Sequence, residues 1–289
     1  MRLRGYLSIF AAALFWGSSG TAAKFLFEHD IPPLLVVESR VIIAAVILTV
    51  FFLLTNPQSL KIKIEDLRDF VLLGIIGVAG SNYTYYMAIQ VTSVGIAILM
   101  QYTAPVLVAL FMVMTKQEKI SKVKILAIAL SLAGCAVMLG AFNPNVHITT
   151  FGIFLGALSA FCFAFFNVFN KVASKHYSVW TALTYTLISA SVFWLILDLF
   201  IHTGIRVVNI SEMTTLAIFS FMSVLIPYFF YFTGLRLLLP STAIIISTLE
   251  PVVAIITSFV VLRETLHFLQ VTGGVLVILA VTLLEVYRE

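Results

Sequence analysis

The sequence has few charged residues and almost no cysteine. Only 10% of its 289 residues are charged and two are cysteines, while 61% are hydrophobic. A water-soluble domain has about a quarter of its residues charged and about half apolar, so this chain has more apolar surface than one soluble core can bury. Cys135 and Cys162 both lie in apolar runs, which favours small apolar fillers over a disulfide or a metal pair. The class that remains is a polytopic α-helical membrane protein, because long apolar runs fill the chain instead of short alternating segments.

Motifs of catalysis and of ATP-driven transport are also missing. The sequence holds no H-E-x-x-H and no Walker A sequence. The five histidines all fall in expected loops or at the ends of expected spans, and they are His29, His147, His176, His202 and His267. We therefore expect no enzyme, no cofactor and no metal. The isoelectric point of about 9.1 does not indicate a nucleic-acid partner, because its meaning depends on where the basic residues lie.

Apolar runs divide the chain into segments of about 20 residues, the length that a membrane-spanning helix needs. The first run follows Arg2 and Arg4 but continues for about 20 residues, so we expect a retained span and not a cleaved signal. The fold class that we predict is all-α, a polytopic membrane protein with ten transmembrane helices. The expected spans are 6–26, 34–54, 69–89, 94–114, 122–141, 151–170, 178–201, 213–235, 241–262 and 267–286.

The basic residues predict how these spans are oriented. Lysine and arginine collect in cytoplasmic loops. With the N-terminus placed in the cytoplasm, 13 of the 17 basic residues lie in inner segments and three in outer segments, while Arg40 lies within a span. The sequence therefore predicts a protein of the inner or plasma membrane with both termini in the cytoplasm.

The sequence repeats itself at a distance of 146 residues. The segment "YYMAIQVTSVGIAILMQYTAPVLVALFMVMTKQEKI" aligns without a gap to "YFTGLRLLLPSTAIIISTLEPVVAIITSFVVLRETL". Pro105 aligns with Pro251, and Glu118 aligns with Glu264. These matches place spans 3–5 over spans 8–10, so we expect a five-helix unit that occurs twice.

We expect the first five-helix unit to cover residues 1–145 and the second to cover residues 146–289. Because five is an odd number of spans, the two units enter the membrane in opposite senses. The charges agree, since the loop around Glu118 is rich in lysine and the loop around Glu264 has one arginine. Inverted repeats of this kind are typical of secondary transporters, because two related halves can open a central site to each side in turn. The alternative is a duplicated membrane scaffold without transport.

Four segments of the chain carry a family resemblance: "LFWGSSGTAAK", "ESRVIIAAVIL", "QYTAPVLVALFMV" with "KQEK" after it, and "LEPVVAIITSFVVLRETL". In this order they resemble the EamA-type members of the drug/metabolite transporter superfamily along essentially the whole chain, and the last segment is the most specific. The resemblance implies ten helices in a 5+5 inverted repeat around a central cavity. It also implies movement of small metabolites, often export of amino acids and related compounds. One departure from symmetry is that the seventh span has no arginine matching Arg40.

Glu250 and Pro251 are adjacent near the middle of the ninth span. A charge at the bilayer centre costs about 2.5–3.5 kcal/mol on an insertion scale, so Glu250 must face protein or water. Three roles remain open for its carboxylate: binding a substrate amine, carrying a coupling proton, or hydrogen-bonding a neighbouring helix. Pro251 has no backbone N–H and crowds the preceding turn, and Pro105 occupies the equivalent position in the fourth span. We expect both prolines to kink their helices around a shared cavity, although membrane helices also tolerate proline elsewhere.

Two basic residues in the first two spans are further site candidates. Arg40 lies two residues from Glu38, a spacing that places the two side chains on different faces of a helix. Arg40 therefore either reaches a substrate carboxylate or pairs with another helix. Lys24, near the outer end of the first span, either contributes to the site or extends to the membrane interface.

Uncharged polar and aromatic side chains within the spans complete the candidate site. Amides at membrane depth find no partner in lipid, and aromatic rings can line a cavity for an amphipathic ligand. For each of them, packing or anchoring at the interface is the alternative. The candidates are Trp16, Asn82, Gln101, Tyr102, Asn167 and Tyr228.

Together these features predict a secondary transporter of small metabolites, with amino acids and related amphoteric compounds as the expected substrates and export as the expected direction. A cavity lined by spans 1–4 and 6–9 would alternate its access, with spans 5 and 10 outside it. The expected partners are the substrate, the lipid bilayer and, as an open question, a coupling proton; the oligomeric state is left open. The alternatives are an exporter of drugs or nucleotide-derived compounds, and a membrane-embedded enzyme or sensor.

Overall fold

The computed structural model describes residues 2–28, 33–92, 94–140, 149–201, 210–263 and 267–287. Every regular element in these ranges is helical, in agreement with the predicted all-α class. In chain order the elements are α1 (Arg2–Glu28), α2 (Pro33–Thr55), η1 (Pro57–Leu60), α3 (Ile64–Leu72), η2 (Leu73–Gly80), α4 (Ser81–Val91), α5 (Val94–Gln101), α6 (Ala104–Met114), α7 (Lys122–Met138), α8 (Thr150–Ala173), α9 (Val179–Ile201), α10 (Ile210–Ser220), η3 (Phe221–Leu225), α11 (Ile226–Leu237), α12 (Pro240–Ser247), α13 (Glu250–Leu262) and α14 (Phe268–Val286).

Seven helical stretches in the described ranges are long and apolar enough to cross a membrane, judged by length and composition. They coincide with the expected spans 2, 4, 6, 7, 8, 9 and 10. The other three expected spans fall on α1, on α3 to α4, and on α7, and the predicted number of ten stays a prediction. The outer surface carries large apolar side chains, and Leu54, Phe200 and Phe268 are each at least 80% exposed. Such a surface suits lipid and not water.

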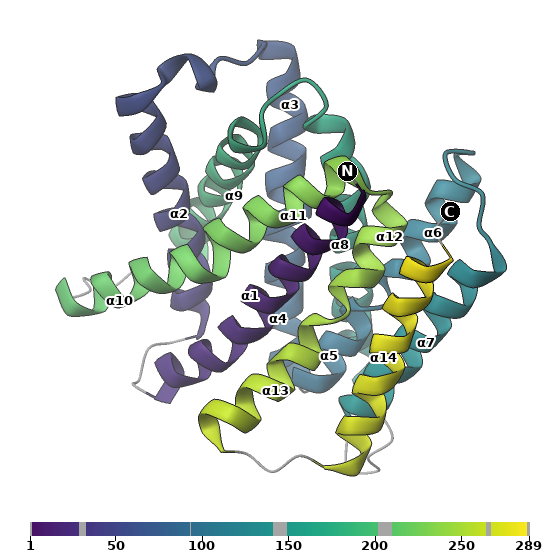
Figure 1. The fold of residues 1–289 in the computed structure, drawn as a ribbon. Coiled ribbons are helices and arrows are strands. Elements are labelled where there is room, and N and C mark those ends of the chain that lie inside the picture. Colours follow the sequence, from purple (N-terminus) through teal and green to yellow (C-terminus); the bar gives the residue numbers. More distant parts are fainter. Residues whose placement is uncertain are drawn as a thin grey trace.

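The bundle places α7 and α14 together on one side and α2 and α10 on the other (Figure 1). α7 and α14 approach so closely that their backbones nearly touch. A Cβ added to Gly273 would lie 2.5 Å from the carbonyl oxygen of Gly134, a distance that only glycine permits. Small residues at such crossings let membrane helices pack tightly. Arg2 and Glu285 line one small cavity, so the two ends of the described chain lie at the same end of the bundle.

Two helices contain a π-helical stretch. η2 joins α3 to α4, and η3 joins α10 to α11, with helical backbone angles at each junction. Residues 75–79 within η2 correspond to η3 when the chain is shifted by 146 residues. π-helical turns are rare and often lie at functional sites, and both of these lead into helices that line the cavity described below.

Two helices break immediately before the repeated prolines. α5 ends at Gln101 and α6 begins at Ala104, while α12 ends at Ser247 and α13 begins at Glu250. The turn between α5 and α6 is closed by Thr103 N–H, which donates to the Met100 carbonyl at 3.0 Å. A proline lacks the N–H that a continuous helix needs, so each helix stops and restarts with its proline in the first turn.

Candidate functional site

A cavity of about 490 Å³ opens between the helices beside both breaks. A volume in this range suits a small-molecule ligand. Its walls come from α1, α2, α4, α5, α8, α11 and α13, with single residues from other elements. The candidate residues that line it are Trp16, Arg40, Asn82, Gln101, Tyr102, Tyr228, Glu250 and Pro251. The side chain of Lys24 lies outside the described part of the structure.

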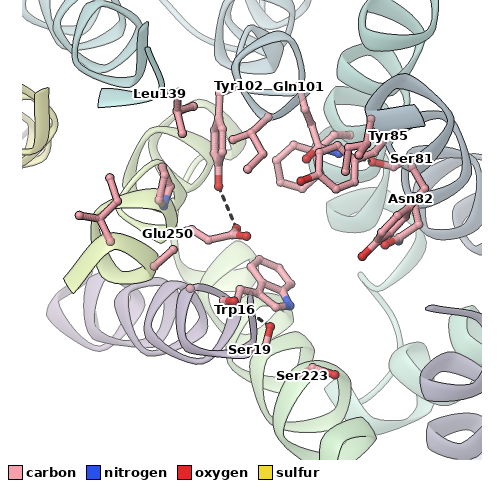
Figure 2. A pocket seen from close by; sticks show the side chains of 18 of the residues that line it. Trp16, Ser19, Ser81, Asn82, Tyr85, Gln101, Tyr102, Leu139, Ser223 and Glu250 are labelled. Carbon is pink, nitrogen blue, oxygen red and sulfur yellow. Dashed lines mark hydrogen bonds between the residues drawn. The ribbon is translucent and has the colours of Figure 1, made fainter. Parts of the chain in front are cut away.

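Glu250 and Tyr102 join the two helix breaks. The hydroxyl of Tyr102 donates to Glu250 Oε2 at 2.8 Å, across the cavity wall (Figure 2). Tyr102 lies in the turn between α5 and α6, and Glu250 is the first residue of α13. A carboxylate at a helix N-terminus is favoured by the unpaired N–H groups and by the helix dipole. The break before Pro251 thus gives Glu250 a polar setting inside an apolar segment.

Arg40 reaches the same cavity from α2. Its Nη2 donates to Asn82 Oδ1 at 2.9 Å, and Asn82 Nδ2 donates to the Val78 carbonyl at 2.7 Å. The backbone carbonyl of Arg40 accepts from the Ser220 hydroxyl at 2.6 Å. Among the described residues the guanidinium therefore has a neutral amide as its partner and forms no ion pair. Its positive charge is left to interact with whatever the cavity holds.

Aromatic rings and hydroxyls surround these charges. Trp16 packs edge-on against Tyr228 with ring centroids 5.2 Å apart, and it contacts Tyr231 at 5.0 Å. Gln101 Nε2 donates to the hydroxyls of Ser81 and Ser159 at 3.0 and 2.9 Å. The Gln101 amide thereby ties α4 and α8 to the α5 break. Figure 2 shows Tyr102, Trp16 and Asn82 around one open space.

Asn167 and Pro105 do not line the cavity. Asn167 accepts from the Tyr231 hydroxyl at 2.5 Å and donates to the Phe163 carbonyl at 2.7 Å. Its side chain is fully buried, so both ends of its amide are used within the protein. Pro105 is buried beside Ala104 in the first turn of α6.

The expected set of cavity-lining helices needs two corrections. α9, the seventh expected span, supplies no described lining residue, because it packs against α2, α3 and η2 and buries Trp194. Conversely, Gln270 of α14 and Leu139 after α7 do line the cavity, although spans 5 and 10 were expected outside it. No sequence pattern marks these two positions, since their place depends on where the helices end. The aromatic residues Phe163 and Phe166 of α8 were likewise missed.

The fold and the cavity define a class, an all-helical membrane protein with a cavity between its helices that charged, polar and aromatic side chains line. The model of the EamA-like transporter family matches the chain twice, over residues 3–140 and 150–286. The chain therefore belongs to the EamA-like transporter family, as its four segments indicated. It is a membrane protein of a transporter family.

Relatives and one solved structure agree with this assignment. The chain is 24% identical to the uncharacterized transporter YyaM of Bacillus subtilis over 96% of this chain and 92% of the relative. It is 30% identical to an uncharacterized transporter of Archaeoglobus fulgidus, over 74% and 76%. It is 25% identical to the threonine/homoserine exporter RhtA of Salmonella typhimurium, over 88% and 82%. A solved crystal structure shares the fold with a TM-score of 0.82, 18% identity and coverage of 99% and 98%.

Proposed function

We propose that this chain is a secondary transporter that exports small amphoteric metabolites, amino acids and related compounds, by alternating access. The observation that carries the proposal is that Glu250 and Arg40 line one cavity of about 490 Å³. An amino acid presents an amine and a carboxylate, and these two side chains offer the complementary charges. The exporter RhtA, which resembles the chain at 25% identity, supports the amino-acid class and the direction.

The proposed architecture is ten transmembrane helices in two inverted five-helix units, residues 1–145 and 146–289. The separate family matches over 3–140 and 150–286 support the division. The recurrence of the helix break and of the π-helical stretch after 146 residues supports it too. Two related halves in opposite senses give a carrier two mirror-like conformations of similar energy, which alternating access requires.

The proposed location is the inner or plasma membrane, with both termini in the cytoplasm. This orientation puts 13 of the 17 basic residues on the cytoplasmic side. A cysteine placed after Tyr287 would test it, because an impermeant maleimide should label that cysteine only in inside-out vesicles. Labelling in right-side-out vesicles would reverse the orientation.

Two roles are proposed for the Glu250 carboxylate, binding of a substrate amine or uptake of a coupling proton. Both use the same physical property, a partly buried acceptor whose only hydrogen-bond partner among the described residues is Tyr102. A substrate amine would bring an opposite charge into hydrogen-bond contact with the carboxylate. A proton would remove the charge and with it the cost of burial.

Transport into proteoliposomes tests the proposal. Purified protein should exchange labelled amino acids across the membrane, and Glu250→Gln should reduce the flux because an amide has no charge for an amine or a proton. Glu65→Gln is the matched control, since Glu65 is exposed in the first turn of α3 and does not line the cavity. Unchanged flux in Glu250→Gln would remove Glu250 from the mechanism. Measuring flux with and without a pH gradient separates the two roles.

Export of drugs or nucleotide-derived compounds is the second candidate. The rings of Trp16, Tyr85 and Tyr228 favour it, because they line the cavity and can stack on flat aromatic ligands. A thermal-shift screen of amino acids, nucleosides, sugars and amines distinguishes the candidates, since a ligand of the folded state raises the apparent stability. Stabilisation by nucleosides and not by amino acids would favour this second candidate.

A further inference from the structure

Several polar contacts between the N-terminal half (residues 1–145) and the C-terminal half (146–289) lie at one end of the bundle. This end holds the loop from 56 to 63, the loop from 115 to 121 and the loop from 174 to 178. We call it the closed end. Two separate groups of contacts cross between the halves here, and each is described below.

The first group joins residues 59–66, which lead into the first turn of α3, to residues 177–185, which lead into α9. The hydroxyl of Tyr177 donates to Asp66 Oδ2 and accepts from the Lys63 N–H at 3.0 Å. Thr181 Oγ1 donates to the Ser59 carbonyl at 2.6 Å, and the Tyr185 hydroxyl donates to the Leu60 carbonyl at 2.6 Å. Three hydroxyls of one half therefore hold one short stretch of the other half.

The bond between Tyr177 and Asp66 is the strongest of this group, because its acceptor is ionised. The same bond raises the pKa of the Tyr177 hydroxyl, since Asp66 favours the protonated donor. Tyr177 lies outside the helices, in the loop between α8 and α9. A contact made by a loop can break without disrupting a helix.

The second group centres on Glu118, in the loop between α6 and α7. Lys124 Nζ lies 2.9 Å from Glu118 Oε2, and the two side chains are 6% and 2% exposed. The hydroxyl of Ser241, at the start of α12, donates to the same Glu118 oxygen. Glu118 Oε1 is buried and has no hydrogen-bond partner among the described residues. Only one oxygen of this buried carboxylate has hydrogen-bond partners among the described residues. The contacts of Glu118 therefore position Ser241 and Lys124 but do not fully offset the cost of burying the charge.

The cavity extends from Glu250 toward the opposite end of the bundle. Ile89, Leu139, Phe259 and Gln270 line it, and each lies within three residues of the end of a helix. These helix ends are the ones remote from the loops of the closed end. The cavity is thus directed toward the end opposite the closed end. A polar contact also crosses between the halves there, from the Thr149 hydroxyl to the Val91 carbonyl at 3.2 Å.

The repeat makes the contacts at the two ends unequal. Shifted by 146 residues, Lys124 corresponds to Gln270. Gln270 caps the start of α14 by accepting from the His267 N–H at 2.9 Å, and it has no charge to pair with a carboxylate. The Glu118–Lys124 pair lies within the N-terminal half, where it holds the Glu118 carboxylate in the position that accepts from Ser241 of the C-terminal half. At the other end, Gln270 cannot hold a carboxylate in this way.

We propose that the Tyr177–Asp66 and Ser241–Glu118 hydrogen bonds form a latch that keeps the closed end shut and must open in each transport cycle, with Lys124 positioning Glu118. The inference rests on the proposed alternating access. The latch determines how often the cavity opens toward the closed end, while the residues that line the cavity determine which substrate is transported. Loss of a latch contact increases the fraction of molecules that are open at this end.

Cysteine accessibility tests the latch in the full chain, with Cys135→Ala and Cys162→Ala as background. Ser174→Cys reports on the closed end, because Ser174 is 1% exposed at the end of α8. Ala254→Cys reports on the cavity that Ala254 lines. Labelling by an impermeant maleimide is measured from each side of oriented vesicles.

The variants that weaken the latch are Tyr177→Phe and Glu118→Gln. In each variant we expect the maleimide to label the Ser174→Cys reporter about tenfold faster, because a hydrogen bond to a charged group is lost. The labelling rate of Ala254→Cys should not increase. Tyr287→Phe and Glu65→Gln are the matched controls, since both residues are exposed, and they should leave both rates unchanged. The inference is overturned if the labelling rate of Ser174→Cys does not rise, or if the control variants raise it equally. It is also overturned if both reporter cysteines are labelled faster, because that result indicates a loss of packing throughout the protein. Labelling needs no substrate, so a wild type without amino-acid flux would refute the proposed substrate and leave this test readable.

Discussion

Gly17 lies where α1 crosses α13 beside the break at Pro251. A Cβ added to Gly17 would lie 2.5 Å from the backbone oxygen of Glu250 and 2.7 Å from Val253 Cβ. Ordinary contact begins at 3.4 Å, so the backbones would have to separate by about 0.9 Å. Overpacking of this kind costs about 1–3 kcal/mol, and each kcal/mol lowers the Tm of a chain of this size by about 2–4 °C. We therefore predict that Gly17→Ala lowers the Tm by several degrees.

Thermal unfolding in detergent measures this effect. Gly274→Ala is the matched control, because a Cβ there would meet its nearest neighbour, Val252 Cγ1, at 3.7 Å, which is ordinary contact. The displaced backbone carries Glu250, so Gly17→Ala should also reduce flux in proteoliposomes, whereas Gly274→Ala should not. Equal unfolding temperatures for the two variants would refute the close approach of α1 to α13.

Three further substitutions test the surroundings of the cavity. Tyr102→Phe removes the donor to Glu250, and we expect slower transport with little loss of stability, measured as flux and Tm; unchanged flux would contradict this. Ala104→Glu places a carboxylate at the position equivalent to Glu250 but in a fully buried apolar cluster, so we expect a large loss of folded protein by size-exclusion chromatography, and a normal yield would refute it. Asn167→Ala leaves the Tyr231 hydroxyl without its acceptor and should cost about 1–3 kcal/mol in thermal unfolding, while Tm unchanged from wild type would show that water replaces the amide.

The proline breaks could be predicted from the sequence because they depend on local chemistry. A proline removes one backbone donor wherever it stands, and the repeat showed that Pro105 and Pro251 are equivalent. The π-helical stretches could not be predicted in this way. The residues of η2, "LGIIGVAG", suit an ordinary helix equally well, and an extra residue per turn is set by the packing of neighbouring helices. The all-helical class followed from composition, whereas the path of α9 away from the cavity depended on tertiary contacts.

The candidate site was predicted by one rule, that polar groups at membrane depth must face protein or a cavity. The rule found Arg40, Glu250 and Tyr102, which line the cavity. The rule does not distinguish a polar group that faces the cavity from one that is buried against protein, and Asn167 shows this. Tyr231 satisfies the Asn167 amide inside the core, so its polarity serves packing. Gln270 was missed for the opposite reason, because its position at a helix end looked peripheral in the sequence.

The two breaks share their geometry but not their chemistry. Tyr102 corresponds to Thr248 and Glu250 corresponds to Ala104 when the chain is shifted by 146 residues. The bond from Tyr102 to Glu250 therefore has no counterpart, since Thr248 donates to the Ile245 carbonyl at 2.6 Å and Ala104 has no polar group. Two carboxylates at equivalent positions beside one cavity would repel each other. Glu250 is the one carboxylate on the cavity wall of the described structure. Under the proposed function, a substrate amine and a coupling proton would therefore compete for Glu250.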